Sequence, residues 1–216
     1  MHAVDRGEEP PELRAVREKY TPKWVGYYRD GEGKKPSDAH WRRFQPDLSD
    51  VFSTLCGYCE RSCNGQVDHF RPKSRDPELV YEWSNWILAC PTCNQKKGEK
   101  WPGGGYVDPC AKTRPAQPEA YFTFDTRTGE IVPGPGLSSH RRRKAAQMIE
   151  DLGLNAYFHL KTRVQWIEVV EAGLRGDDPE DPDHAQFIRY VAARERELSS
   201  ITQAFLAEGG YAIVEG

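Results

Sequence analysis

Short apolar runs in the middle of the chain predict two strands followed by a helix. Residues 66–70 alternate polar and apolar side chains, and residues 86–89 form a second apolar run, which is the pattern of short strands. Pro72 ends the first strand, because proline cannot donate a hydrogen bond to a sheet. Pro91 stands where a helix can begin, and residues 92–100 continue with good helix formers.

The apolar pattern becomes helical after residue 138. Ser138 or Ser139 can cap a helix that runs to about Leu152, where Gly153 stops it. The first turns of this helix carry a basic pentad, residues 140–144 (His-Arg-Arg-Arg-Lys). Two interpretations of the pentad stay open: contact with DNA or an acidic partner, or a solvated turn whose cations oppose the helix dipole.

Two further helices are predicted near the C-terminal end, over residues 155–174 and 183–207. An acidic loop, residues 176–183, separates them. The last helix has an apolar stripe that is more typical of a core or a partner surface than of a cofactor pocket. Its members are Phe187, Tyr190, Val191, Leu198, Ile201 and Phe205.

The remaining segments are predicted to be short elements joined by loops. Residues 11–20 and 47–55 read as helices, and residues 26–38 read as a loop. In a stretch rich in proline and glycine, residues 121–125 and 130–132 predict a β-hairpin. Three aromatic residues of the N-terminal part are expected to anchor its core rather than to stack on bases: Trp24, Trp41 and Phe44.

These elements predict an α+β fold in which a small ββα core is embedded in a mostly helical chain. Four segments are expected. They are an N-terminal preface (1–55), the ββα core (56–115), a β-hairpin extension (116–137) and a helical C-terminal region that binds a partner (138–216).

Composition excludes several classes of protein. The chain has 216 residues, 38% of them hydrophobic, and a net charge of −3, so it is globular but not a strongly basic nucleic-acid binder. We expect no membrane span and no signal peptide, because no long apolar run occurs. Six cysteines with metal-like spacing then indicate a reducing cytoplasm. The sequence GxxxxGK[ST] is not present, so the chain is not expected to hydrolyse ATP itself.

Two C-x2-C pairs predict a structural zinc site. Four thiolates from Cys56, Cys59, Cys90 and Cys93 can complete one tetrahedral shell, which leaves no open position for catalysis. The alternative is four buried or disulfide-bonded cysteines. Cys63 could compete as a ligand, although the symmetrical pairs are preferred, and both Cys63 and Cys110 are expected to be structural.

Between the cysteine pairs lie four residues with catalytic potential: Asp68, His69, Asn85 and Asn94. A carboxylate, an imidazole and an amide on one face form a partly open oxygen site, which suits Mg²⁺ with its retained waters and a substrate phosphate. A neutral imidazole can also take a proton from water near pH 7. Each residue alone would be read as an ordinary core, turn or cap residue; only the combination is specific.

The stretch 56–100 resembles the HNH (ββα-metal) endonuclease motif in its form with four zinc-binding cysteines. The resemblance implies that His69 is the general base, that Asp68 and Asn94 bind one catalytic Mg²⁺ or Mn²⁺, and that Asn85 fixes the loop. Asn94 stands where many members of the family have histidine.

A looser resemblance covers residues 46–165. The segments C-x-Y-C-E, DHFRPKS, W-x-N-W-I-L-A-C-x-x-C-N-x-x-K and VDPC are similar to those of HNH endonucleases from retron and Septu anti-phage systems. In those systems the nuclease works with a separate ATPase of the SMC/ABC type. The resemblance therefore implies a partner of that kind for this chain.

Basic residues near the predicted site are candidates for phosphate contacts: Arg71, Lys73, Arg75, Lys96, Lys97 and Lys100. The plainer interpretation is a solvated charged face. Taken together, the sequence predicts a metal-dependent endonuclease that cuts DNA by direct attack of water and leaves 5′-phosphate and 3′-hydroxyl ends. The alternatives are a non-catalytic zinc module that binds nucleic acid or protein, and an HNH-type RNase.

Overall fold

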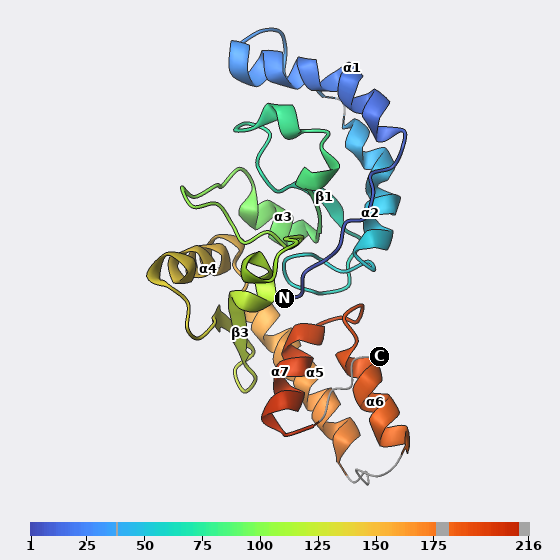
Figure 1. Ribbon diagram of the computed structural model, residues 1–216, viewed down its shortest axis with the longest axis vertical. Helices are drawn as coiled ribbons and strands as arrows, with labels where there is room; N and C mark the ends of the chain where they lie inside the picture. The colour runs from blue at the N-terminus through green and yellow to red at the C-terminus, as the bar shows by residue number, and fades with distance from the viewer. Residues whose placement is uncertain (38, 176–181, 212–216) are drawn as a thin grey trace.

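The computed structural model describes residues 1–37, 39–175 and 182–211. It combines helices with two small antiparallel sheets, which confirms the predicted α+β class. In Figure 1, helix α1 (Leu13–Val25) lies at one end of the long axis, and α5 (Tyr157–Leu174), α6 (Pro182–Ala192) and α7 (Ser199–Glu208) lie at the other. Strand β1 (Gln66–His69) and helix α3 (Pro91–Lys97) lie between these ends.

The central unit has the predicted order of strand, loop, strand and helix. Strand β1 pairs with β2 (Trp86–Ala89) in antiparallel register, with Val67 opposite Leu88 and His69 opposite Trp86. All four residues of β2 are buried, as expected for a strand covered on both faces. Helix α3 starts two residues after β2, and its cap is a cysteine thiol, since Cys90 Sγ accepts the backbone N–H of Cys93.

The first helix of the N-terminal part continues further than the predicted residues 11–20. Residues 26–30, expected to begin a loop, form a π-helical turn (Gly26–Asp30) that continues α1. The N–H of Gly26 bonds to Pro22 O, and the chain leaves the helix only at Gly31, which has a φ of 69°. A glycine that keeps helical dihedral angles does not end a helix, so Gly26 was a weaker stop signal than its residue type suggested.

The other N-terminal helix, α2 (Gln45–Val51), is shorter than expected and packs on β2. Trp24 and Phe44 are buried in the main core, as predicted, whereas Trp41 is only partly buried against it. The short 3₁₀ turns of the structure are His40–Phe44, Pro77–Leu79, Trp83–Asn85, Arg114–Ala116 and Pro118–Ala120.

The predicted hairpin and its following helix are both present. Strands β3 (Phe122–Asp125) and β4 (Glu130–Pro133) pair in antiparallel register. The turn between them needs a left-handed residue, which Gly129 supplies with a φ of 73°. Helix α4 (Ser139–Leu152) is capped by the Ser138 hydroxyl, and Gly153 ends it, as the sequence indicated.

The single helix predicted over 183–207 is wrong, because it is two helices, α6 and α7. The chain breaks between them at Leu198, which has a φ of 58° and donates its N–H to Glu60 O. Ser200 then donates to the Glu60 carboxylate at 2.6 Å. A tertiary contact with a distant loop therefore redirects the chain. The apolar pattern of residues 183–207 alone does not reveal such a contact.

The predicted acidic loop over 176–183 falls mostly outside the described residues. Among the helices that the structure describes, none has the length and apolar character needed to cross a membrane.

Candidate active site and zinc centre

Four cysteines converge on one point of the central unit. The sulfurs of Cys56, Cys59, Cys90 and Cys93 all lie within 4.8 Å of one another. In a tetrahedral zinc–thiolate centre, a Zn–S bond of about 2.3 Å puts the sulfurs about 3.8 Å apart. The sulfurs of Cys59 and Cys90 are 3.9 Å apart, so this donor set fits zinc.

Backbone contacts explain why the two cysteine pairs meet. The first pair lies on a tight loop, in which Cys56 N–H bonds to Arg61 O and Gly57 N–H bonds to Leu88 O of β2. A side chain at position 57 would not fit, because a Cβ there would lie 2.7 Å from Phe52. The second pair starts α3 directly after β2, so β2 positions both pairs.

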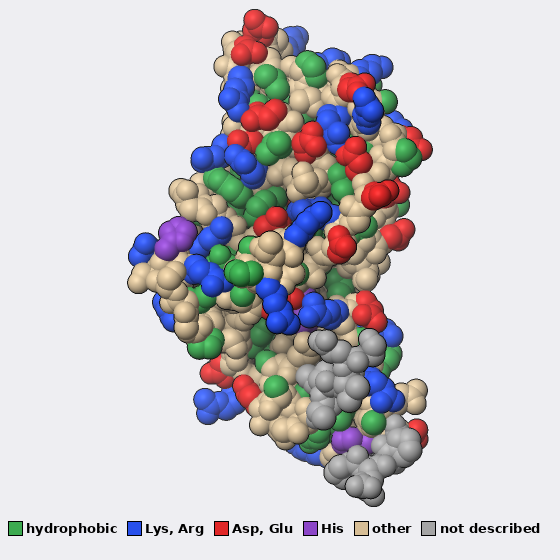
Figure 2. All heavy atoms as spheres, viewed as in Figure 1, with side chains coloured by type: hydrophobic (Ala, Val, Ile, Leu, Met, Phe, Trp, Pro, Cys, Tyr) green, Lys and Arg blue, Asp and Glu red, His purple; other side chains and the backbone are tan. Residues whose placement is uncertain are grey.

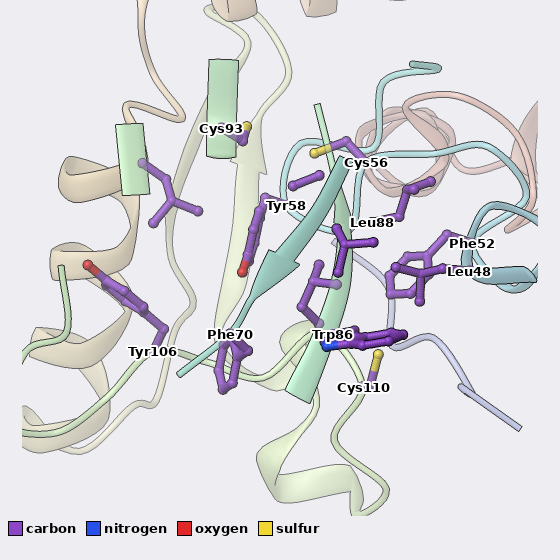
Figure 3. Packing of buried hydrophobic residues seen from close by; sticks show 14 of the residues in the cluster. Leu48, Phe52, Cys56, Tyr58, Phe70, Trp86, Leu88, Cys93, Tyr106 and Cys110 are labelled. Atoms are coloured by element: carbon purple, nitrogen blue, oxygen red, sulfur yellow. The ribbon is translucent and has the colours of Figure 1, made fainter. Parts of the chain in front are cut away.

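The other two cysteines lie apart from this centre. Cys63 is partly buried and is not one of the four clustered thiols. Cys110 is buried and is likewise not one of the four clustered thiols, and Figure 3 shows it apart from Cys56 and Cys93. All six cysteines are free thiols in the described chain, so the disulfide alternative is not realised.

Three of the predicted catalytic residues line one pocket of about 420 Å³. Asp68 and His69 reach it from β1, and Asn94 reaches it from α3. Trp41 and Lys73 form part of its wall. The ββα unit therefore gathers a carboxylate, an imidazole and an amide around one space large enough for a phosphate group.

His69 has a defined tautomer. Its Nε2 lies 2.8 Å from Val80 O, and because a carbonyl only accepts, Nε2 carries the proton and Nδ1 carries the lone pair. Trp41 stands edge-on to the ring at 4.8 Å. Burial lowers the pKa of His69 well below its usual value, and the nearby Lys73 ammonium lowers it further. The ring is thus neutral at pH 7, with Nδ1 able to accept a proton.

The carboxylate of Asp68 is buried and held from two sides. Tyr58 Oη donates to Oδ2 at 2.5 Å, and Lys97 Nζ donates to Oδ1 at 3.0 Å. Burial raises the pKa of Tyr58 well above its usual value, and Asp68 raises it further, so the hydroxyl remains a donor. A carboxylate has about four acceptor positions, so two remain for other ligands.

Lys97 requires a correction. It was predicted to contact phosphate, but its side chain is fully buried. Its ammonium is bound by Asp68 and, at 2.7 Å, by His69 O. A cation held inside the core by two acceptors does not reach a surface phosphate, so Lys97 belongs to the support of the site.

Asn85 lies outside the pocket and bonds only to the loop that joins the strands. Its Oδ1 accepts from Arg71 N–H at 2.8 Å, and its Nδ2 donates to Arg71 O and Leu79 O. These are the contacts of an amide that fixes a loop. Asn94 is different: its Nδ2 donates to Gln66 Oε1 at 2.9 Å, so its Oδ1 is the atom suited to ligating a cation.

The remaining basic residues differ in whether their charged groups are exposed or already paired with an acceptor in the protein. Lys73 Nζ is 3.5 Å from His69 Nδ1, at the pocket wall, and Lys96 is exposed on α3. Arg71 pairs with Asp76 at 2.8 Å, and Lys100 donates to Asp151 O. Figure 2 shows positive and negative side chains interspersed over the upper part of the viewed face. The chain has nearly equal numbers of basic and acidic residues, 30 and 33.

Sequence reasoning missed two residues of the site, Tyr58 and Trp41. Tyr58 had one signal, its position inside the first C-x2-C pair, where a buried aromatic side chain must lie close to the metal centre. Trp41 had none, because it comes from a distant segment that only the fold brings beside His69.

Comparison with known proteins agrees with this geometry. Residues 56–100 match the family model described as HNH endonuclease, which confirms the resemblance. Over 56 residues, or 24% of the chain, the sequence is 39% identical to the Septu protein PtuB of Bacillus thuringiensis. The match spans 22% of that relative's length. It supports a nuclease role for the central unit.

Proposed function

We propose that this protein is a metal-dependent HNH endonuclease that hydrolyses DNA phosphodiester bonds. The observation that carries the proposal is the meeting of Asp68, His69 and Asn94 around one pocket of a zinc-tied ββα unit. Such a set supplies an oxygen site for a cation beside an imidazole base. A non-catalytic zinc module would need none of these three residues in one place.

In this proposal Asp68 and Asn94 would hold Mg²⁺ or Mn²⁺ through a carboxylate oxygen and an amide oxygen. The bound cation would neutralise charge that develops on the scissile phosphate and the leaving oxygen. His69 Nδ1, whose lone pair is fixed by the Nε2–Val80 bond, takes the proton from the attacking water. The water oxygen would bond to phosphorus as the bond to the 3′ oxygen breaks. The leaving 3′ oxygen would take a proton from a solvent water, which yields a 5′-phosphate and a 3′-hydroxyl.

Lys73 is the basic residue best placed to contact the substrate. Its ammonium is at the pocket wall, 3.5 Å from His69 Nδ1, and lies over the Trp41 ring at 5.2 Å. An incoming phosphate would find this cation beside the base. Arg71, Lys96 and Lys100 would contribute more distant contacts along the backbone.

The weak overall charge favours a partner protein. A chain of net charge −3 gains little from counterion release, so it would bind DNA weakly alone at physiological salt. The similarity to a Septu protein supports a role as the nuclease of a cytoplasmic anti-phage system, with an SMC/ABC-type ATPase as partner. The helical C-terminal region is the proposed contact for that partner.

The test is cleavage of supercoiled plasmid by the purified full chain with Mg²⁺ or Mn²⁺. Wild type is compared with His69→Ala and with Glu18→Ala, a substitution at an exposed residue on α1 that serves as the control. We expect nicking that requires the cation, survives Glu18→Ala and is lost in His69→Ala. Equal cleavage by His69→Ala would reject His69 as the base.

A comparison of different nucleic-acid substrates distinguishes the DNA endonuclease from the RNase and from the non-catalytic binding module. Matched duplex DNA, single-stranded DNA and RNA of one sequence are offered to the zinc-loaded protein, with and without a co-purified ATPase. Cleavage of RNA alone would favour the RNase alternative. No cleavage of any substrate in either condition would favour the binding module.

A further inference from the structure

The first zinc-binding pair carries a residue that reaches the proposed catalytic site. Tyr58 lies between Cys56 and Cys59, and its ring is 1% exposed. Its hydroxyl donates to Asp68 Oδ2 at 2.5 Å. Figure 3 shows the ring running beside β1, with its oxygen pointing away from the Cys56 and Cys93 sulfurs.

The position of this hydroxyl depends on the zinc-binding loop. The two cysteines of the pair that encloses Tyr58, Cys56 and Cys59, both belong to the four-sulfur centre. Gly57 ties the same loop to β2 through its N–H bond to Leu88 O, at 2.8 Å. Because the loop is held by the cysteine cluster and by β2, and because the tyrosine ring is itself rigid, the Tyr58 hydroxyl has little freedom to move.

Asp68 receives its second donor from the other half of the zinc centre. Lys97 lies in the last turn of α3, the helix whose first turn contains Cys93. Its Nζ binds Asp68 Oδ1 at 3.0 Å. Each carboxylate oxygen of Asp68 therefore accepts a hydrogen bond from one side chain. Tyr58 lies within the first cysteine pair, and Lys97 lies on the helix that contains Cys93 of the second pair.

We propose that Tyr58 is a positioning residue that transmits the geometry of the zinc centre to the catalytic cation site. Its hydroxyl fixes the rotation of the Asp68 carboxylate, so that the remaining acceptor positions face the pocket. This inference rests on the proposed function, because it takes Asp68 as a ligand of the catalytic cation. Partners that orient a metal ligand are commonly worth 10- to 100-fold in affinity, so about tenfold is expected for one hydroxyl.

The experiment compares Tyr58→Phe with Tyr106→Phe in the full, zinc-loaded chain. Tyr106 is another buried tyrosine, whose hydroxyl donates to Asp151 in a partly buried bond, and its loss controls for removal of a tyrosine hydroxyl elsewhere. Zinc content is measured by elemental analysis, and Mn²⁺ binding by electron paramagnetic resonance of the free ion. Plasmid cleavage is then measured over a range of Mn²⁺ concentrations.

We expect Tyr58→Phe to keep its zinc, to bind Mn²⁺ about tenfold more weakly and to need about tenfold more Mn²⁺ for half-maximal cleavage. Tyr106→Phe should match wild type in all three. Unchanged Mn²⁺ affinity in Tyr58→Phe would overturn the inference. Loss of zinc in Tyr58→Phe would also overturn it, because the tyrosine would then serve the zinc loop alone.

Asp68→Ala, which leaves no oxygen ligand at this position, separates failure of this inference from failure of the proposed function. If Asp68→Ala abolishes Mn²⁺ binding while Tyr58→Phe does not weaken it, only the role of Tyr58 is wrong. If Asp68→Ala binds Mn²⁺ like wild type, Asp68 is not a ligand, and both the proposed cation site and the inference are wrong.

Discussion

The residues of the site divide into those that face the pocket and those that hold them in place. His69 and Asn94 each use one polar atom for support and keep another for chemistry. Asp68 uses both oxygens for support but retains acceptor positions. Lys97 and Asn85 are wholly engaged inside the protein, so they act through their neighbours.

Lys97 and Asp68 form a buried ion pair, and breaking it should be costly. Lys97→Met leaves the Asp68 carboxylate buried with no cation, which we expect to lower the free energy of unfolding by about 3 kcal/mol. Urea denaturation measures the loss. The control is Lys96→Met, the exposed neighbour on α3, which should stay within about 0.5 kcal/mol of wild type. Equal stability of the two variants would contradict the pairing.

His69 makes stability depend on pH in a defined direction. Burial keeps the folded ring neutral below the usual pKa of about 6.5, where the unfolded ring takes up a proton. The unfolded state then binds more protons, so stability due to His69 is fully present above pH 6.5 and is lost as the pH falls below it.

His69→Gln removes this titration. Between pH 7.5 and pH 5.5, wild type should lose about 1 kcal/mol more unfolding free energy than His69→Gln. Chemical denaturation of both proteins at the two pH values gives the difference, in which groups that titrate alike in the two proteins cancel. A wild type that loses no more than the variant would mean that His69 is not held neutral.

At the scale of elements, the central unit depends on close contact between the first zinc-binding loop and β2. Gly57→Ala would place a Cβ 2.7 Å from Phe52 and 2.8 Å from Ile87, both buried in the core. We expect a loss of about 2 kcal/mol by thermal unfolding, together with weaker zinc retention. Gly103→Ala, with open space around it, is the matched control and should be neutral.

The sequence predicted the elements that depend on local interactions better than those that depend on contacts with distant segments. The ββα order, the hairpin and the Ser138–Gly153 limits of α4 depend on local patterns, and each is present. The break at Leu198 and the continuation through Gly26 depend on backbone bonds that residue types alone do not reveal.

The same distinction applies to the site. The four cysteines and the pair Asp68–His69 could be found because their spacing along the chain is itself informative. The burial of Lys97 could not be predicted, since two adjacent lysines at the end of a short helix give no sign of which one points inward. Trp41 reaches His69 only through the folding of a distant segment.

At the scale of the whole molecule, one residue links the zinc-binding loop to the C-terminal helices. Glu60 follows Cys59 directly, and it accepts bonds from Leu198 N–H and from both the N–H and the hydroxyl of Ser200. These contacts join the loop to the turn between α6 and α7. We therefore expect zinc bound by the four cysteines to stabilise both the proposed catalytic pocket and the attachment of the helical region.

Cys56→Ser tests this arrangement, with Cys110→Ser as control. Cys56 is one of the four clustered thiols, whereas Cys110 is a buried cysteine outside that cluster. Because a structural zinc ion contributes on the order of 10 kcal/mol to folding, we expect Cys56→Ser to lose zinc and to unfold at a much lower temperature. Cys110→Ser should keep its zinc. Limited proteolysis should then cut Cys56→Ser early near residues 193–198, where the bonds to Glu60 have been lost; a variant that lost zinc but resisted cleavage there would show that the helical region is held independently of the zinc centre.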